Sequence, residues 1–342
     1  MENRNHSYLL VTGGAGYIGS HTVVELIEAG HNVIVFDDFS NSSRASIEGV
    51  RKICGKEPIV IEGNIANEEL LQNVFKEYRI DSVLHFAGLK SVADSVSQPL
   101  KYYVENVGSS LCLFEAMEHN NVRKIIFSSS ATVYESIGEQ PYSELSPTSP
   151  ENPYGKTKLC VEQILQGLAD TNPNWEIGIL RYFNPVGAHP SGLIGEDPKQ
   201  QPNNLMPLIM QTAVGRRKKL EIYGDDYDTP DGTCIRDYIH VLDLARGHLL
   251  ALKHLENHPG IHFWNLGTGK GTSVKELVQQ AKEITGSEID TQVVARRPGD
   301  NPIAVADPKK AKKELMWHPE YSLANMCADH WNWQYQHPDG YQ

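Results

Sequence analysis

The chain has 342 residues, of which 40% are hydrophobic and 22% are charged, and its formal net charge is −12. A chain of this length buries a sizeable core and forms one to three domains. The negative charge argues against a protein that binds nucleic acid or anionic membranes, although a local pocket can still bind a phosphorylated ligand.

The pattern of cysteines and the length of the apolar runs indicate in which cellular compartment the protein is expected. The cysteines are odd in number and form no C-x-x-C pair, so we expect a reducing cytoplasm, with neither a disulfide framework nor a zinc site. No long apolar segment opens the chain and no run of eighteen apolar residues occurs, so we expect neither a signal peptide nor a membrane span. The cysteines are Cys54, Cys112, Cys160, Cys234 and Cys327.

Short apolar runs rich in β-branched residues alternate with helix-like segments in the first half of the chain. This alternation predicts an α/β fold of the Rossmann type with a doubly wound parallel sheet, and continuous hydrophobic runs are typical of strands buried on both faces. The predicted strands are Tyr8–Val11, Val33–Phe36, Ile59–Ile61, Ser82–Phe86, Lys124–Phe127 and Ile177–Tyr182. The predicted helices are Ser20–Ala29, Glu68–Tyr78, Ser109–His119 and Lys156–Ala169.

The texture of the sequence changes after Asn184. The segment Pro185–Pro207 is rich in Pro, Gly and Asn and is predicted to be a long functional loop. The region after it predicts a smaller mixed α/β substrate domain, which lies over the carboxyl ends of the sheet, where ligands bind in such folds. We therefore expect residues 1–184 to form an NAD-binding domain and residues 185–342 to form mainly the substrate domain, with some segments returning to the first.

A glycine-rich turn joins the first predicted strand to the first helix. Gly13 permits a tight turn, Gly16 lets backbone N–H groups approach a pyrophosphate, and Gly19 permits close packing of helix and strand. Such a glycine cluster is by itself often only a turn. Asp37, eighteen residues after Gly19, strengthens the prediction, because its carboxylate can accept from ribose hydroxyls and repels a 2′-phosphate. NAD is therefore favoured over NADP.

Tyr154 and Lys158 stand four residues apart, which places them on one face of a predicted helix. Asn152 and Pro153 have the residue types of a helix cap and a first helical residue. The lysine, the helix N-terminus and a cationic nicotinamide ring together favour a phenolate, although lowering a phenol pKa from about 10 to about 7 takes about 4 kcal/mol. This spacing is also common on surface helices without any function, so it only nominates Tyr154 as a base.

A run of hydroxyl-bearing residues, Ser128–Tyr134, follows the predicted strand Lys124–Phe127. Hydroxyl groups at the carboxyl end of a strand can donate to a substrate oxygen or relay a proton from it. Position therefore favours a functional role for this run, although serine runs elsewhere are more often solvated turns.

Together these motifs resemble the extended short-chain dehydrogenase/reductase family, and within it the UDP-hexose 4-epimerases. The resemblance covers almost the whole chain, and its last four blocks are far more specific than the glycine turn. Beyond that turn, the blocks are His85–Lys90, Ser128–Tyr134, Tyr154–Lys158, Arg181–Gly192, Pro202–Pro207, Arg236–Val241 and Arg296–Asp300.

The resemblance implies an NAD-dependent enzyme that inverts C4 of UDP-glucose and UDP-galactose. In the family's mechanism Tyr154 removes the proton of the sugar 4-hydroxyl, Ser130 assists, and Lys158 tunes the tyrosine and binds the nicotinamide ribose. Hydride passes from C4 to NAD, the 4-keto sugar rotates, and hydride returns to the other face. The family also implies a homodimer formed through helices of the first domain.

The resemblance further implies two sets of binding residues. In the cofactor set Lys90 contacts the pyrophosphate, and Asn64 replaces the usual aspartate beside the adenine amino group. Besides Gly13, Gly16, Gly19, Asp37, Tyr154 and Lys158, the cofactor set comprises Tyr17, Ile18, Asn64, Ile65, Phe86, Ala87, Lys90 and Tyr182. The substrate set comprises Ser130, Asn184, Asn204, Leu205, Tyr223, Arg236, Arg297, Asp300 and Ala304.

Ala304 departs from the family pattern in an informative way. At this position a bulky tyrosine goes with unacetylated sugars, and a small residue goes with enzymes that also accept N-acetylated ones. Ala304 therefore predicts that UDP-GlcNAc and UDP-GalNAc are substrates as well, unless a backbone shift lets Ile303 or Val305 refill the space. Glu105 and Glu135 also depart from the pattern, and their roles stay open.

Two other functions fit the same scaffold. A 4,6-dehydratase needs an acid–base pair after the active-site threonine, whereas Val133 follows Thr132 here, and a uronate decarboxylase is the related possibility. A non-catalytic NAD-sensing regulator can lose the base, whereas Tyr154 is present. No His-x-x-x-His pair stands in a helix-like setting, so we expect no metal site.

Overall fold

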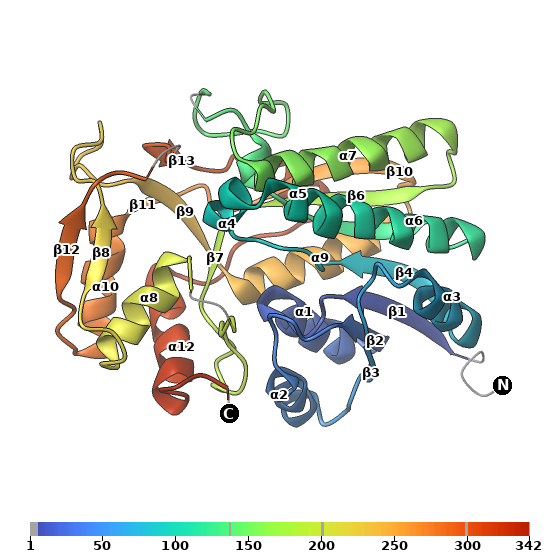
Figure 1. The fold of residues 1–342 in the computed structure, drawn as a ribbon, viewed down its shortest axis with the longest axis horizontal. Coiled ribbons are helices and arrows are strands. Elements are labelled where there is room, and N and C mark those ends of the chain that lie inside the picture. The colour runs from blue at the N-terminus through green and yellow to red at the C-terminus, as the bar shows by residue number, and fades with distance from the viewer. Residues whose placement is uncertain (1–5, 137, 200–201, 298–299, 342) are drawn as a thin grey trace.

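A seven-stranded parallel sheet forms the larger lobe of the computed structural model, which describes residues 6–136, 138–199, 202–297 and 300–341 (Figure 1). The strand order is β10-β6-β5-β4-β1-β2-β3, with every neighbouring pair parallel. This confirms the predicted α/β fold of the Rossmann type. The strands are β1 (Ser7–Thr12), β2 (Asn32–Asp37), β3 (Ile59–Glu62), β4 (Arg79–His85), β5 (Lys124–Ser130), β6 (Glu176–Tyr182) and β10 (Gly260–Leu266).

The order of the strands reverses between β1 and β4, and this reversal positions the site. The chain runs outward from β1 through β2 to β3 on one side and from β4 through β5 and β6 to β10 on the other. The loops that leave the carboxyl ends of β1 and β4 therefore flank a crevice, which is where open α/β sheets bind ligands. The glycine turn follows β1 and the segment Phe86–Lys90 follows β4.

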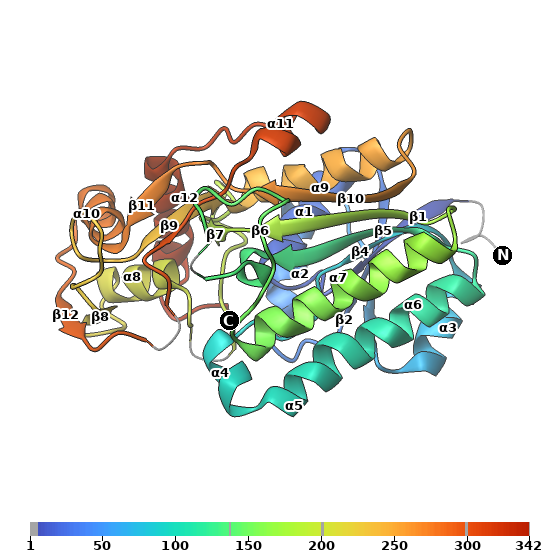
Figure 2. The ribbon, with the colours of Figure 1, turned by 90° about the horizontal axis from the view of Figure 1, so that it is seen from above.

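Helices cover both faces of this sheet and bury its apolar side chains (Figure 2). One buried cluster joins the sheet to α1 (Tyr17–Glu28), α2 (Arg44–Cys54) and α9 (Val241–Leu255). The other joins it to α3 (Glu68–Glu77), α6 (Ser109–His119) and α7 (Pro153–Thr171). Before α6, the chain forms α4 (Val92–Ser97), α5 (Pro99–Tyr102) and a π-helical turn (Tyr103–Gly108).

Two of the predicted helical patterns start later than the helices themselves. The helix α1 begins at Tyr17, three residues before the predicted Ser20, and α7 begins at Pro153, three residues before the pattern Lys156–Ala169. Both first turns contain glycine or proline, whose low helix propensity hides them from a pattern of apolar residues. Asn152 is the cap of α7, as its residue type predicts, and its side chain accepts from Gly155 N.

A smaller lobe packs beside the carboxyl ends of the sheet (Figures 1 and 2). In its sheet β7 (Asn184–Val186) and β13 (Ile303–Ala304) run parallel to β9 (Ile235–His240), and β11 (Gly271–Ser273) runs antiparallel to it. A second ribbon pairs β8 (Leu220–Tyr223) with β12 (Thr291–Val294). Its helices are α8 (Leu205–Ala213), α10 (Val274–Thr285) and α12 (Leu323–Gln336), and α11 (Lys309–Glu314) contacts β10 of the large sheet.

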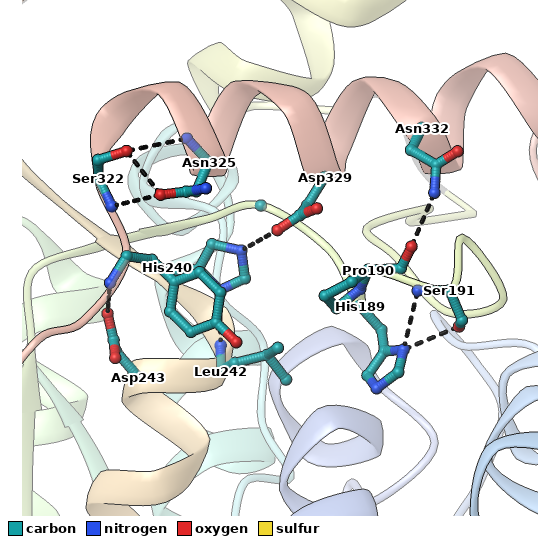
Figure 3. A network of polar contacts seen from close by, with 12 residues as sticks. His189, Pro190, Ser191, His240, Leu242, Asp243, Ser322, Asn325, Asp329 and Asn332 are labelled. Atoms are coloured by element: carbon teal, nitrogen blue, oxygen red, sulfur yellow. Dashed lines mark hydrogen bonds and ion pairs between the residues drawn. The ribbon is translucent and has the colours of Figure 1, made fainter.

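The segment predicted as the loop Pro185–Pro207 is only partly a loop. Its start lies in β7 and its end lies in α8. Contacts with side chains of distant elements hold the part between them. Figure 3 shows His240 beside Asp329 of α12, at 3.2 Å, and Asn332 of the same helix donating to Pro190 O at 2.9 Å. Gly187, with φ +92°, passes so close that an added Cβ would lie 2.7 Å from His240 Nε2. These contacts between distant residues leave no local sequence signal.

None of the helices in the described part of the chain combines the length and the apolar character that a bilayer span requires.

Candidate active site

The turn after β1 forms a cradle that only glycine can line. Gly13 has φ +70°, and an added Cβ would lie 2.7 Å from Ala87 N. At Gly19 an added Cβ would lie 2.2 Å from Gly13 O, so α1 approaches the end of β1 closely at this glycine, as the prediction of close helix–strand packing requires. Gly16 caps α1 without a side-chain hydrogen bond, which leaves N–H groups of the first helical turn, at Tyr17 and Ile18, without a side-chain cap. Such a turn suits a pyrophosphate.

Asp37 is buried beside this turn at the end of β2. Its Oδ2 accepts from Ala15 N at 2.9 Å, and its Oδ1 accepts from Phe39 N at 2.9 Å and from Ser42 Oγ at 2.8 Å. Burial raises the pKa of this carboxyl, and the three hydrogen bonds oppose that shift. A carboxylate has about four acceptor sites, so Oδ2 keeps capacity for a ribose hydroxyl.

Asn64 lies close to the same edge of the sheet. Its Nδ2 donates to Asp38 Oδ2 at 3.0 Å, and its Oδ1 accepts from Ala66 N at 2.9 Å. These bonds fix the orientation of the side chain, and the carbonyl keeps a second lone pair for an adenine amino group. Ile65, next along the chain, is buried.

Tyr154 and Lys158 project from the first turns of α7 toward the carboxyl end of β5. Lys158 Nζ donates to Ser128 O at 2.8 Å and lies 6.0 Å from the centroid of the Tyr154 ring. Ser130 ends β5, and a hydrogen bond links its side chain to Tyr154. Ser130 Oγ also accepts from Thr132 Oγ1 at 3.0 Å. The structure therefore brings together all three predicted catalytic residues.

The pKa values of this pair show which of the three expected positive charges the phenolate depends on. Burial raises the pKa of Tyr154 to about 12, and the hydrogen bond with Ser130 opposes that rise. Burial also lowers the pKa of Lys158 to about 8, against the attraction of Glu162. Lys158 and the helix terminus therefore do not make the phenol acidic by themselves. A further positive charge beside the ring is needed, and an oxidised nicotinamide carries one.

The loop after β4 is held by a residue that sequence reasoning missed. Asn106, buried in the π-helical turn, accepts from Leu89 N at 2.7 Å and donates to Leu89 O at 3.0 Å and to Thr157 Oγ1 at 3.0 Å. It thereby ties the loop that holds Phe86 and Ala87 to the catalytic helix α7. No motif marks this asparagine, because its partners lie 17 and 51 residues away.

Aromatic contacts complete the nicotinamide end of the predicted cofactor site. The ring of His248, on α9, lies 4.8 Å from the ring of Phe86, and its Nε2 is hydrogen-bonded to Tyr182 OH. Burial lowers the pKa of His248 to about 4, so the imidazole stays neutral. His248 had no sequence signal, because it lies within a helix predicted only as part of a mixed region.

Lys90 and Asn204, predicted for the cofactor and the substrate respectively, meet on one buried carboxylate. Lys90 Nζ lies 2.9 Å from Glu196 Oε1, and Asn204 Nδ2 donates to the same oxygen at 2.7 Å. Glu196 Oε2 is buried and has no partner among the residues that the structure describes. Lys90 therefore contacts a carboxylate here, and must turn away from it to contact a pyrophosphate.

Apart from Ser130, the predicted substrate residues lie in the smaller lobe. Asn184 on β7 and Ala304 on β13 flank β9, where Ala304 pairs with Arg236. Arg236 donates to Asn301 O at 2.7 Å and lies 3.8 Å from Asp300 Oδ1. The Arg297 guanidinium lies 3.8 Å from the centroid of the Tyr223 ring, and Leu205 begins α8 directly after Asn204. Pro298 and Gly299 of the last sequence block lie outside the described residues.

The register around Ala304 is fixed by neighbouring hydrogen bonds. Val305 N donates to Gln140 Oε1 at 3.0 Å, and Ala306 N donates to Asp237 Oδ2 at 3.1 Å. Ile303 and Val305 project to the opposite face of the strand from Ala304, since side chains alternate. A shift that refills the space at Ala304 would break these bonds.

A buried ion pair joins α7 to strand β6, next to the candidate active site. Arg181 on β6 donates through Nη2 to Glu162 Oε2 at 2.7 Å and through Nε to Glu162 Oε1 at 3.0 Å. Ser129, next to Ser130, donates to Glu162 as well. The sequence placed Arg181 in a specific block without giving it a partner, because Glu162 lies in the middle of α7.

A doubly wound sheet with a glycine cradle at its switch point, and a Tyr-x-x-x-Lys pair beside it, defines a dinucleotide-binding α/β enzyme. Residues 9–267 match the NAD dependent epimerase/dehydratase family. The chain belongs to this family.

Similar proteins agree over nearly the full length. The chain is 53% identical over 334 residues to the UDP-glucose 4-epimerase of Dictyostelium discoideum, and this alignment covers 97% of each chain. It is 50% identical over 334 residues to the UDP-glucose 4-epimerase of Bacillus subtilis (strain 168), and this alignment covers 98% of each chain. The crystal structure of UDP-glucose 4-epimerase from Bifidobacterium longum in complex with NAD+ and UDP is similar with a TM-score of 0.95 and 49% identity, covering 98% of this chain and 100% of that one.

Proposed function

We propose that this chain is an NAD-dependent epimerase that inverts C4 of UDP-hexoses, both UDP-glucose/UDP-galactose and UDP-GlcNAc/UDP-GalNAc. The observation that supports it most directly is the contact of Ser130 with Tyr154 above Lys158, at the carboxyl end of β5. Relatives named UDP-glucose 4-epimerase match the chain over 97% and 98% of its length. In this proposal residues 1–184 bind NAD and residues 185–342 mainly bind the UDP-sugar, with α9 and β10 returning to the large sheet.

The residues of the cradle fit NAD. The glycine turn offers N–H groups to a pyrophosphate, and Asp37 offers a carboxylate to the adenosine ribose but no cation for a 2′-phosphate. Asn64 and Ile65 stand at the adenine end, and Phe86, Ala87 and Tyr182 stand at the nicotinamide end. When bound, NAD would supply the acceptor for the hydride of C4.

The chain's own residues handle the proton and hold the sugar. Tyr154 takes the proton of the 4-hydroxyl and gives it back on the other face, while Ser130 donates to the same sugar oxygen. Lys158 orients the tyrosine and the nicotinamide ribose. Because a set of residues, called the clamp here, binds only the UDP end of the substrate, the 4-keto sugar is free to rotate about its link to the diphosphate. The proposed clamp comprises Asn184, Asn204, Leu205, Tyr223, Arg236, Arg297 and Asp300.

The proposed cycle regenerates NAD, so the purified protein is expected to retain it. Heat-released small molecules, separated by liquid chromatography, should contain about one NAD per chain without added cofactor. Gly13→Val should abolish this retention, because its Cβ would press on Ala87 N at 2.7 Å. Wild-type protein that yields no dinucleotide would contradict the proposal.

Ala304 is proposed to admit the 2-acetamido group of N-acetylated sugars. A coupled assay with the four UDP-sugars is expected to show turnover of both pairs in the wild type. Ala304→Tyr is expected to abolish UDP-GalNAc turnover while leaving most UDP-galactose turnover, because the ring fills the space beside C2. Ala304→Ser is the matched control and should keep both activities. Absence of UDP-GalNAc turnover in the wild type would refute this assignment, while UDP-galactose turnover tests the epimerase itself.

We also propose a homodimer that forms through the flank of α4, α5, the π-helical turn and α6, which lie together in Figure 2. This flank gathers exposed apolar side chains, including Val96 (65%), Leu100 (76%) and Val104 (58%). Apolar patches of this kind mark protein–protein contacts.

Cytoplasmic location is part of the same proposal, and it is supported by the free state of all five cysteines.

The dimer proposal predicts the effect of charge on this flank. The double variant Leu100→Glu/Val104→Glu is expected to elute as a monomer in size-exclusion chromatography with light scattering, because the carboxylates would have to be buried at the interface. Leu145→Glu is the control, since Leu145 is 96% exposed in a loop away from the flank. A wild-type monomer, or a double variant that remains dimeric, would rule out this interface.

A further inference from the structure

Three histidines with a regular spacing gather away from the proposed active site. His254, His258 and His262 are each four residues apart, although neither pair lies within one helix, in agreement with the sequence prediction. His254 lies in the last turn of α9, His258 follows that helix, and His262 lies in β10. We call these three residues and Glu314 of α11 the histidine cluster.

The ligand atoms of this cluster lie close together. One ligand atom from each of His254, His262 and Glu314 is within 4.8 Å of the others, and all three residues are half-buried. The rings of His254 and His258 stack with centroids 4.0 Å apart, and the rings of His254 and His262 meet edge to face at 5.2 Å.

Each histidine is oriented by its other ring nitrogen. His258 Nδ1 lies 3.0 Å from His254 O, and His262 Nε2 lies 3.0 Å from His258 O. A carbonyl oxygen only accepts, so these ring nitrogens donate, and the second nitrogen of each ring keeps its lone pair. His254 is bonded in the same way to the backbone of Glu314. Metal-binding histidines have this pattern, in which the nitrogen that is not a ligand donates to a carbonyl.

Glu314 is oriented in a comparable way. The Nε1 group of Trp264, a fully buried residue on β10, donates to Glu314 Oε2 at 2.8 Å. Among the residues that the structure describes, no hydrogen bond occupies Oε1, so this oxygen can act as a ligand. An oriented carboxylate and two oriented imidazoles therefore surround one point, and they come from α9, β10 and α11.

We propose that His254, His262 and Glu314 bind a Zn²⁺ ion, with water or a rotated His258 as the fourth ligand. Two imidazoles and a carboxylate favour zinc over the harder Mg²⁺ and Ca²⁺ ions, which prefer oxygen ligands. Zinc–ligand bonds of about 2.0–2.1 Å require the donor atoms to approach more closely than the present separations of up to 4.8 Å. Small shifts of the side chains that keep these hydrogen bonds can provide this approach, because the three residues are only half-buried.

The site links an edge strand to a helix near the end of the chain. β10 is the edge strand of the seven-stranded sheet, and α11 contacts it. His262 lies near the amino end of β10, whereas the catalytic residues lie at the carboxyl ends of the strands. The ion therefore acts as a structural clip between α11 and the sheet, and it takes no part in the chemistry at Tyr154.

Titration of the chelator-treated, NAD-loaded protein with zinc chloride tests the proposal. Isothermal calorimetry should show one Zn²⁺ per chain, and Co²⁺ in its place should give visible absorption bands of low-coordinate geometry. The Zn²⁺ Kd should rise about tenfold or more in His262→Gln and in Glu314→Gln, with His119→Gln, an exposed histidine elsewhere, as the unaffected control. Zinc should raise the melting temperature of the wild type and not that of His262→Gln.

Three results would overturn the proposal: no saturable Zn²⁺ binding to the wild type, an affinity in both variants equal to that of the wild type, or an equal loss of binding in His119→Gln. Glu314→Gln guards against misfolding of the histidine variant, because its amide carbonyl still accepts from Trp264. Turnover of UDP-galactose should be the same with and without zinc, and a zinc-dependent rate would refute the separation from the active site.

Discussion

Tyr154→Phe is expected to lower the turnover of UDP-galactose about 10²- to 10⁴-fold, which is the usual range for the loss of a general acid–base group. The substitution removes only the phenolic oxygen, so the fold, the NAD content and the packing of α7 should persist. Steady-state kinetics of the purified variant measure the loss. Because the oxygen acts on the reacting hydroxyl and not on UDP, the fall should appear in kcat far more than in KM.

The control for this substitution is Tyr335→Phe, since Tyr335 is 70% exposed on α12. It should leave kcat unchanged. An undiminished rate in Tyr154→Phe would mean that another group is the base. The pH profile adds a second reading. Burial holds the pKa of Tyr154 at about 12 in the chain alone, so activity that already rises with pH well below 12 would show that the bound cofactor lowers this pKa.

Removal of Glu162 is expected to cost about 3–5 kcal/mol of stability, because it leaves the buried Arg181 charge without its partner. Glu162 and Arg181 side chains are only 3% and 6% exposed and form two parallel hydrogen bonds. Glu162→Ala should therefore shift the urea unfolding midpoint strongly, as followed by circular dichroism. Loss of the same carboxylate also frees Ser129, next to the proposed catalytic Ser130.

Two further variants separate the burial of charge from the loss of contacts. Glu162→Leu/Arg181→Met removes both charges and should be more stable than Glu162→Ala. Glu48→Ala removes a partner of Arg51 from an exposed i,i+3 pair and should change the midpoint little. If Glu162→Ala unfolds at the same urea concentration as Glu48→Ala, the buried pair does not hold the active-site strands.

Local patterns were sufficient where one segment determines its own structure. The runs around Leu10, Ile34 and Ile125 are continuously apolar, and all three residues are fully buried in the parallel sheet. Asn152 and Pro153 predict the start of a helix, and they begin α7. Gly13 predicts a tight turn, and its φ is +70°.

Contacts between distant residues had no such pattern. Asn106 holds Leu89 and Thr157, and Glu196 holds Lys90 across 106 residues. The acidity expected of Tyr154 also depended on the environment, because burial raises its pKa. A sequence pattern carries residue type and spacing, whereas the cost of desolvation depends on what surrounds the group.

The amino-acid sequence by itself determined the alternation of strands and helices, the glycine turn, the spacing of the proposed catalytic pair and the family, since each resides in a short segment or a fixed spacing. Only the tertiary structure decided that β10 returns to the large sheet, that Lys90 meets Glu196, and that His254, His262 and Glu314 share one point. The physical reason is that packing brings together groups far apart in the chain, and their separations and burial arise only when the chain has folded.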